Sequence, residues 1–92
     1  MADRATLIEA FLQEAGWAGA KRSLLAGDAS FRRYERIERE GGRAVLMDAP
    51  PPEEDVRPFI NITTHLRELE LSAPAIFAED IEAGFLLLED LG

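Results

Sequence analysis

The sequence predicts an α+β domain, in which an N-terminal helix leads into a five-stranded antiparallel sheet, with one helix between strands 3 and 4. Two segments carry apolar residues at helical spacing, and five short apolar runs have the length of strands. Glycine or proline separates most of these segments, and the short connections between neighbouring strands favour hairpins. The strands are therefore expected to pair in antiparallel fashion.

The first predicted helix covers residues 4–15, where apolar side chains return every three or four positions. Asp3 is suited to be its N-cap, and Gly16 is suited to end it. Trp17 follows directly, and we expect it to pack locally rather than to bind a ligand.

The five predicted strands cover residues 21–26, 31–38, 43–49, 75–78 and 84–88. Gly27 and Asp28 supply turn residues after the first strand. Gly41 and Gly42 predict a hairpin turn between the second and third strands, since both accept a positive φ. Three consecutive prolines at 50–52 end the third strand, because proline donates no ladder hydrogen bond.

The second predicted helix begins near Pro58, which fits a first helical turn, and ends before Pro74. The carboxylates at 53–55 precede it and suit the positive end of the helix dipole better than a metal site. His65 is the single histidine, and we expect it to be structural. One apolar stripe is predicted to face the sheet, made of Phe59, Ile62, Leu66 and Leu69.

Composition narrows the possible partners. The 92 residues carry a formal net charge of −8, which argues against binding to nucleic acid or to an anionic membrane surface. No cysteine is present, so thiol chemistry and disulfides are excluded. No apolar run reaches the length of a membrane span, and we expect a cytoplasmic setting. The chain ends directly after the apolar run 85–88, so we expect it to continue.

The stretch LAGDASFRRYERI, residues 25–37, combines a glycine turn, a hydroxyl and three arginines in an otherwise acidic chain. One interpretation is a tight turn with solvated arginines. The other is an anion site, in which backbone N–H groups and the Ser30 hydroxyl face phosphate oxygens and an arginine adds charge. Asp28 would repel an anion, so it is better suited to cap the turn.

Three strings carry a resemblance to a known family: GDASFRRYERI, VLMDAPPPEEDVRPF and FLLLEDLG. With this order of elements, the chain resembles the protein-kinase-like small lobe of aminoglycoside phosphotransferase-like kinases. The nearest branch is a bacterial one that phosphorylates the cell-wall amino sugars N-acetylmuramate and N-acetylglucosamine at the anomeric hydroxyl.

The resemblance implies that residues 1–92 form an N-terminal nucleotide-binding lobe. ATP, Mg²⁺ and a sugar acceptor would meet between this lobe and a larger C-terminal lobe that carries the catalytic aspartate and the magnesium ligands. Residues 1–92 alone are therefore expected to be inactive. Apolar residues near the end of the chain, namely Leu87, Leu88 and Leu91, are expected to be exposed without that second lobe.

The resemblance also implies a nucleotide site. The phosphate loop would include Asp28, Ala29, Ser30, Phe31, Arg32 and Arg33. Val45 and Met47 would line the site from the third strand. The last strand would be the hinge: Leu87 and Leu88 would flank adenine, and the carbonyl of Leu88 and the N–H of Asp90, with Glu89 between them, would bond its edge.

One position departs from the family pattern. These kinases commonly place a lysine where this chain has Met47, and a glutamate on the following helix where it has Ile60 or Asn61. Strand alternation puts Arg33 on one face with Ile37, and Arg36 on the other. We expect the face of Ile37 to be the cleft side, with Arg33 reaching the phosphates beside Met47 and Arg36 in water. Arg32, at the tip of the loop, is the alternative source of this charge.

A function of another class stays open at this point. The chain could be a non-catalytic interaction domain that recognises an anionic partner through Arg32, Arg33 and Arg36. A kinase lobe should continue into a chain with an HxD motif and a later aspartate for magnesium, whereas an interaction domain need not.

Overall fold

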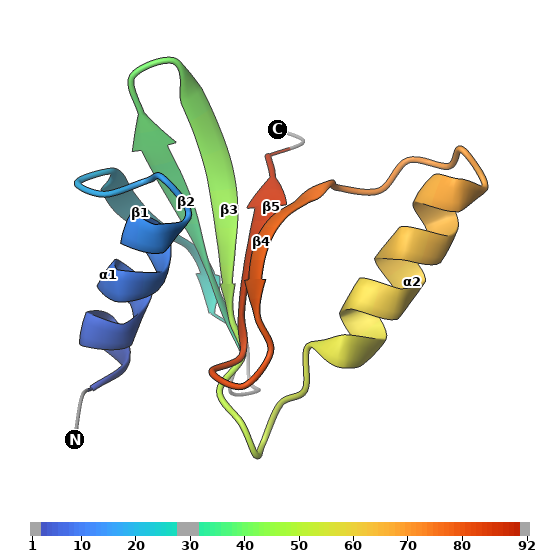
Figure 1. Ribbon diagram of the computed structural model, residues 1–92, viewed down its shortest axis with the longest axis horizontal. Coiled ribbons are helices and arrows are strands. Elements are labelled where there is room, and N and C mark those ends of the chain that lie inside the picture. Colours follow the sequence, from blue (N-terminus) through green and yellow to red (C-terminus); the bar gives the residue numbers. More distant parts are fainter. Residues whose placement is uncertain (1–2, 28–31, 91–92) are drawn as a thin grey trace.

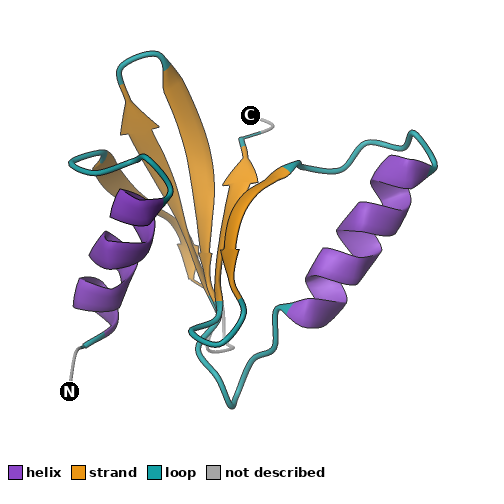
Figure 2. Cartoon of the chain, in the orientation of Figure 1, coloured by secondary structure: helices purple, strands orange, loops and turns teal. Residues whose placement is uncertain are grey.

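The computed structural model describes residues 3–27 and 32–90. The element order is α1 (Arg4–Glu14), β1 (Lys21–Gly27), β2 (Arg33–Arg39), β3 (Gly42–Asp48), α2 (Arg57–Glu68), β4 (Ile76–Asp80) and β5 (Phe85–Glu89). The five strands form one sheet in the order β1-β2-β3-β5-β4, and every neighbouring pair is antiparallel. The predicted fold class is confirmed. The two helices flank the sheet on opposite sides (Figures 1 and 2).

The strand register fixes which side chains share a face of the sheet. Met47 lies opposite Tyr34 of β2 and Leu86 of β5, so these three point to one side. Glu35 and Leu87 lie opposite Leu46 and point to the other side. We call these the α2 face and the α1 face, after the helix that packs on each.

Helix α1 begins at an N-cap, as predicted: the Asp3 carboxylate accepts a hydrogen bond from the Thr6 N–H at 2.8 Å. Trp17 is buried, and the Arg39 guanidinium lies over its ring at 3.9 Å, so its role is local packing. The core under this helix consists of Ile8, Phe11, Leu12, Trp17, Ile37, Ala44, Leu46, Phe85 and Leu87.

Two arginines fasten α1 to the sheet. Arg4 bonds the Asp48 carboxylate and the Ala83 carbonyl, and its guanidinium lies 4.4 Å from the centre of the Phe85 ring. Arg22 of β1 bonds Glu35 on the next strand and Glu9 of the helix. These charges hold the helix against the sheet, so they are not available to a partner.

A second core lies on the α2 face, made of Met47, Ala49, Val56, Leu86 and Leu88, with partly buried side chains around it. The helix presents Phe59, Ile60 and Thr63 to this core. The predicted stripe is therefore right at Phe59 but wrong at Ile62 and Leu69, which are 61% and 56% exposed. Val56, one residue before the helix, is buried in this core. Because it fixes the start of α2, the side of the helix that carries Phe59 and Ile60 turns toward the sheet.

The β2–β3 turn differs by one residue from the prediction. Arg39 pairs with Gly42, so the two-residue loop is Glu40–Gly41, and only Gly41 has a positive φ, +86°. Gly42 begins β3 instead, and a Cβ there would touch the Trp17 ring. Neither described helix is long and apolar enough to cross a membrane.

Candidate functional site

The α2 face is covered only in part. Met47, Leu86 and Leu88 are buried beneath the helix. Toward β1 and β2 the same face opens: Tyr34, Arg36 and Val45 are half-buried, and Lys21, Ser23 and Arg43 are exposed. This open half of the sheet, beside the segment that follows β5, is the candidate functional site.

The segment after β5 is fixed from both sides. The Glu89 N–H donates to the Ala75 carbonyl at 2.8 Å, and the Glu89 carboxylate accepts from the Ala75 N–H at 3.0 Å. The Asp90 side chain turns to the α2 face, where it is 5% exposed and accepts from Arg36 Nε at 2.9 Å. Arg43 Nε lies 3.7 Å from the same carboxylate. Two strands of the sheet thus hold the chain where it leaves β5.

The opposite end of the face carries a second ion pair. Arg32, just before β2, bonds Glu54 in the β3–α2 connection, with Nη2 at 2.8 Å and Nε at 3.0 Å from Oε1. The pKa of the Arg32 guanidinium is raised above its ordinary value, first by a hydrogen bond to the Tyr34 side chain and then by Glu54, against the effect of burial. The arginine is therefore held beside the ring that lies opposite Met47.

Arg33 lies on the face of Ile37, as expected, but that face is not the face of Met47, so the expected reach of Arg33 to the side of Met47 is wrong. The register places Arg33 opposite Asp48, on the α1 face with Ile37, while Arg36 lies opposite Val45 on the α2 face. The buried face of β2 is the one under α1, and it is not the face of Met47. Arg33 is 55% exposed there, and its nearest carboxylate, that of Glu35, is 3.9 Å away. Arg36 is not a solvated residue, because it binds Asp90.

Three apolar residues also differ from expectation. The Leu87 side chain is fully buried under α1, so it does not flank a ligand on the α2 face. Met47 is fully buried beneath α2 and has no surface to offer a ligand, which fits a gap-filling core residue. Leu87 and Leu88 are not exposed, and the exposed apolar side chains lie elsewhere, including those of Ile62, Leu69, Leu71, Leu24 and Phe77.

The remaining predicted site residues divide into two groups. Arg32, Val45, Leu88 and Asp90 all lie on or beside the α2 face, and Glu89 lies at its edge. Asp28, Ala29, Ser30 and Phe31, like Leu91, lie outside the described residues. Sequence reasoning missed Tyr34, Arg36, Arg43 and Glu54 as neighbours of this site. The residues of β2 and β3 among them could have been found from the sequence. A two-residue turn at 40–41 or at 41–42 pairs Met47 with an even-numbered residue of β2, which puts Tyr34 and Arg36 on the face of Met47.

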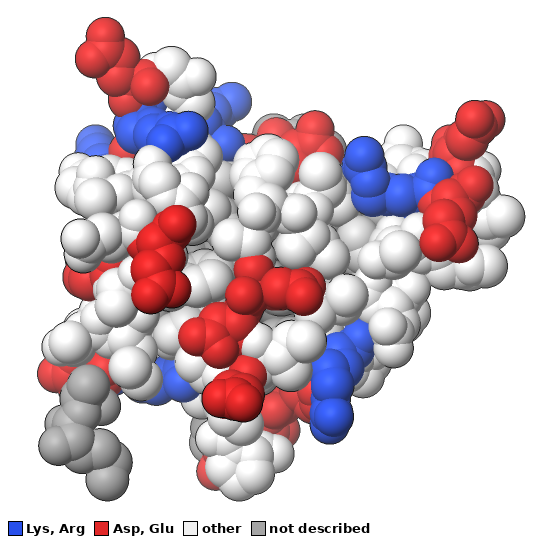
Figure 3. Space-filling model, in the orientation of Figure 1, with Lys and Arg blue, Asp and Glu red and all other residues white. Residues whose placement is uncertain are grey.

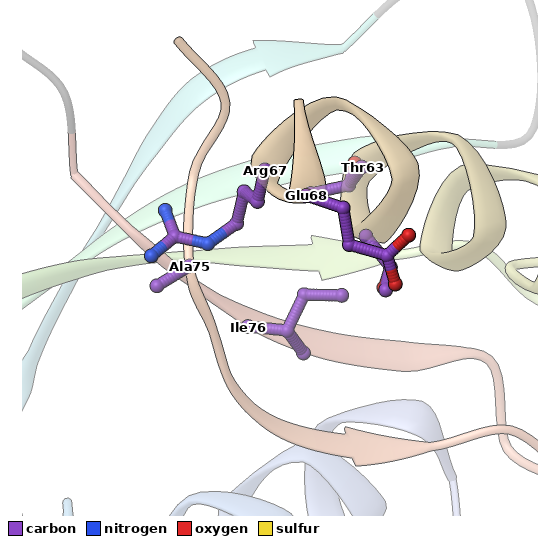
Figure 4. Close-up of a pocket in the computed structure, with 6 residues that line it drawn as sticks. Thr63, Arg67, Glu68, Ala75 and Ile76 are labelled. Carbon is purple, nitrogen blue, oxygen red and sulfur yellow. The ribbon is translucent and has the colours of Figure 1, made fainter. Parts of the chain in front are cut away.

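A pocket of about 440 Å³ lies beyond this open half, between the second half of α2 and the start of β4 (Figure 4). Thr63, Arg67, Glu68, Ala75 and Ile76 line it with Thr64. Arg67 Nη1 donates to the Ala73 carbonyl at 2.9 Å, which anchors the connection into β4. None of the predicted site residues lines this pocket, so we treat it as separate from the candidate site.

Charge is distributed without a basic patch in the view of Figure 3, where acidic side chains lie toward the middle and most Lys and Arg toward the edges. Arg32 and Arg36 bind carboxylates, and Arg33 points to the opposite face from Arg36. These three arginines therefore do not form one surface for an anionic partner. Within residues 3–27 and 32–90, no group of three or more His, Asp or Glu side chains is arranged to hold a metal ion.

The fold and the site define a class. A five-stranded antiparallel sheet with a helix between its third and fourth strands is the α+β architecture of a kinase small lobe. The chain belongs to the phosphotransferase enzyme family, whose pattern matches residues 21–92.

Three individual relatives carry the same name, N-acetylmuramate/N-acetylglucosamine kinase. The protein from Pseudomonas putida is 52% identical over 67 residues, which are 73% of this chain and 20% of the relative. The protein from Pseudomonas aeruginosa is 46% identical over 94% of this chain and 26% of the relative. The protein from Caulobacter vibrioides is 34% identical over 90% of this chain and 30% of the relative. The chain thus spans between 20% and 30% of the length of these relatives.

Proposed function

We propose that this chain is the ATP-binding lobe of a kinase that transfers the γ-phosphate of ATP to the anomeric hydroxyl of an amino sugar. One observation carries the proposal: the matched relatives are named as N-acetylmuramate/N-acetylglucosamine kinases, and one match covers 94% of this chain. The sheet supports it, because its half-open α2 face leaves room for a flat ligand beside the segment that follows β5. We place this activity in the cytoplasm, where ATP is available.

In this proposal adenine lies on the open part of the α2 face. Val45 is half-buried there and offers an apolar surface, with Leu88 beside it in the register. The backbone of Glu89 and Asp90 would bond the edge of the base. Residues 28–31, together with Arg32, would lie over the phosphates, and for residues 28–31 this stays a prediction from sequence.

Magnesium is part of this reaction class, because it neutralises charge that develops on the phosphates. The described residues do not provide a ligand set for it. We therefore propose that the C-terminal lobe supplies the magnesium ligands and the catalytic aspartate.

The test uses the full-length protein with ATP, Mg²⁺ and either N-acetylmuramate or N-acetylglucosamine. We expect ADP to form in equal amount to a sugar phosphate whose phosphorus is bonded through the anomeric oxygen, as detected by phosphorus NMR. The matched control is the methyl glycoside of the same sugar, in which that hydroxyl is blocked, and it should give no product. ADP formation without any sugar phosphate would contradict the proposal, as would equal phosphorylation of the methyl glycoside.

A further inference from the structure

The α2 face lacks a cation at the position where related kinases commonly place one. Met47 is buried and uncharged, and the side of α2 that packs against it offers Phe59, Ile60 and Thr63 rather than a carboxylate. A triphosphate carries several negative charges, and binding it on a largely apolar face without a counter-charge is unfavourable. A cation that this chain itself contributes therefore has to lie at the rim of the face.

Arg36 and Arg32 lie toward the two ends of this face, and Arg43 lies near Arg36, 3.7 Å from the same Asp90 carboxylate. Arg36 lies opposite Val45 and bonds Asp90 where the chain leaves β5. Arg32 directly precedes Arg33, which pairs with Asp48 at the end of the β2–β3 ladder. It therefore lies at the end of the face where β2 begins and where β3 leads into the connection to α2 (Figure 1). Four residues along a strand separate the two arginines, roughly 13 Å at the usual rise of about 3.3 Å per residue. One arginine therefore lies beside the candidate adenine position, and the other lies where an extended triphosphate would reach.

Arg32 is held in place before any ligand binds. Glu54 Oε1 accepts from both Nη2 and Nε, at 2.8 Å and 3.0 Å. The Arg32 side chain is 25% exposed and that of Glu54 is 17% exposed, so the pair is partly desolvated. A guanidinium has five N–H donors in a fixed plane, and it can bond a carboxylate along one edge and a phosphate along another.

We propose that Arg32 binds the phosphates of the nucleotide and that Glu54 is the positioning residue that orients its guanidinium. This inference rests on the proposed function. In this proposal, Arg32 and Glu54 replace the lysine and the glutamate that related kinases commonly have on the third strand and on the following helix. The cation comes instead from the start of β2, and the carboxylate comes from the connection before α2. Glu54 belongs to the acidic run at 53–55, for which sequence alone suggested only an interaction with the helix dipole.

The neighbouring pair of Asp55 and Arg57 provides a matched control. Arg57 bonds Asp55 with Nη2 at 2.8 Å from Oδ2, and it lowers the pKa of that carboxyl to about 2. Its side chain is 68% exposed, and it bonds a residue only two positions away. It is therefore an arginine–carboxylate pair at the junction of the same connection with α2, but one held in solvent.

The experiment measures binding of ATP and of adenosine to the full-length protein by calorimetry, together with kcat and KM. We expect Arg32→Ala to weaken ATP binding about 10- to 100-fold, the range for a lost hydrogen bond to a charged group, and to leave adenosine affinity unchanged. Arg32→Lys should recover part of the loss, because it restores charge without the planar fork. Arg57→Ala should leave both affinities unchanged.

The role of Glu54 is tested by coupling. Glu54→Ala should weaken ATP binding about 3- to 10-fold, Glu54→Gln should weaken it less, and the double variant Arg32→Ala/Glu54→Ala should be no weaker than Arg32→Ala alone. Unchanged ATP affinity in Arg32→Ala would overturn the inference, as would equal loss of ATP and adenosine binding. Tighter ATP binding in Glu54→Ala would also overturn it, since Glu54 would then compete with phosphate. If the unmodified protein binds no ATP, the proposed function fails, and the inference fails with it.

Discussion

Arg36 shows how the position of one residue changes its expected role. In the sequence it is one of several arginines close together, and strand alternation suggested a solvated side chain. In the structure it binds the Asp90 carboxylate, which is 5% exposed. A carboxylate buried to this degree depends on its partners, because burial without them disfavours its charge. Arg36 therefore contributes to the position of the segment after β5.

The first prediction concerns this pair. Arg36→Ala should lower the free energy of unfolding by about 1–3 kcal/mol, because it removes the closer charged partner of Asp90. Arg43→Ala is the matched control, since Arg43 Nε is 3.7 Å from the same carboxylate and its side chain is 55% exposed. It should cost less than about 1 kcal/mol. Urea denaturation of both variants measures the difference, and equal losses would contradict the account.

A second prediction concerns Gly84 in the β4–β5 turn. Its φ is +81°, and a Cβ there would overlap the carbonyl oxygen of Ala49, whose backbone is held close because the Ala49 N–H donates to the Gly84 carbonyl at 2.8 Å. Gly84→Ala should therefore destabilise the protein by about 2–5 kcal/mol. Gly41→Ala has a similar φ, +86°, but open space around the Cβ, and should cost only about 1–2 kcal/mol. Similar thermal shifts for the two variants would refute this distinction.

At the scale of elements, the sequence predicted the helices and strands well because their signals are local. Asp3, the turn around Gly41 and the proline run each act on neighbouring backbone, so they mark boundaries without knowledge of the fold. The rotation of α2 is not local. Ile60 and Ile62 are both apolar and lie on different sides of the helix, so the pattern alone does not say which one faces the sheet. The packing of Val56 and Phe59 against the sheet turns Ile60 inward and leaves Ile62 exposed.

The third prediction separates the two sides of α2. Val56→Ala should cost about 1.5–3 kcal/mol, because Val56 is 1% exposed in the core beneath the helix. Ile62→Ala should change stability by less than about 0.5 kcal/mol, because Ile62 is 61% exposed. Denaturation of the two variants under the same conditions compares them. A larger loss for Ile62→Ala would show that the predicted stripe, rather than the observed one, faces the sheet.

The candidate site was harder to predict than the fold, for a physical reason. The sequence identified the segments that contribute, but a site depends on which face each side chain occupies. Counting residues away from the β2–β3 turn would have paired Met47 with an even-numbered residue of β2. Arg33 is odd-numbered, so the same count would have put it on the face opposite to that of Met47. The pairing of Arg32 with Glu54 joins residues 22 positions apart through the β3–α2 connection, and no local pattern encodes such a contact.

At the scale of the whole molecule, the proposed function has this chain supply one side of a nucleotide site, and residues 3–27 and 32–90 hold no group of side chains arranged to bind a metal ion. Phosphoryl transfer depends on positioned phosphates and on metal-assisted neutralisation of charge. We therefore expect residues 1–92 alone, incubated with labelled ATP, Mg²⁺ and the amino sugars, to form no sugar phosphate. Product formation that follows this chain through purification would contradict the assignment of the catalytic groups to a second lobe.

The central claim is that ATP binds on the open part of the α2 face. The most direct measurement is a crystal structure of the full-length protein with Mg²⁺ and a non-hydrolysable ATP analogue. We predict that adenine lies against Val45 beside the backbone of Glu89 and Asp90, and that a phosphate oxygen accepts a hydrogen bond from Arg32. An analogue seated in the pocket between α2 and β4, or one that makes no contact with this face, would contradict the claim.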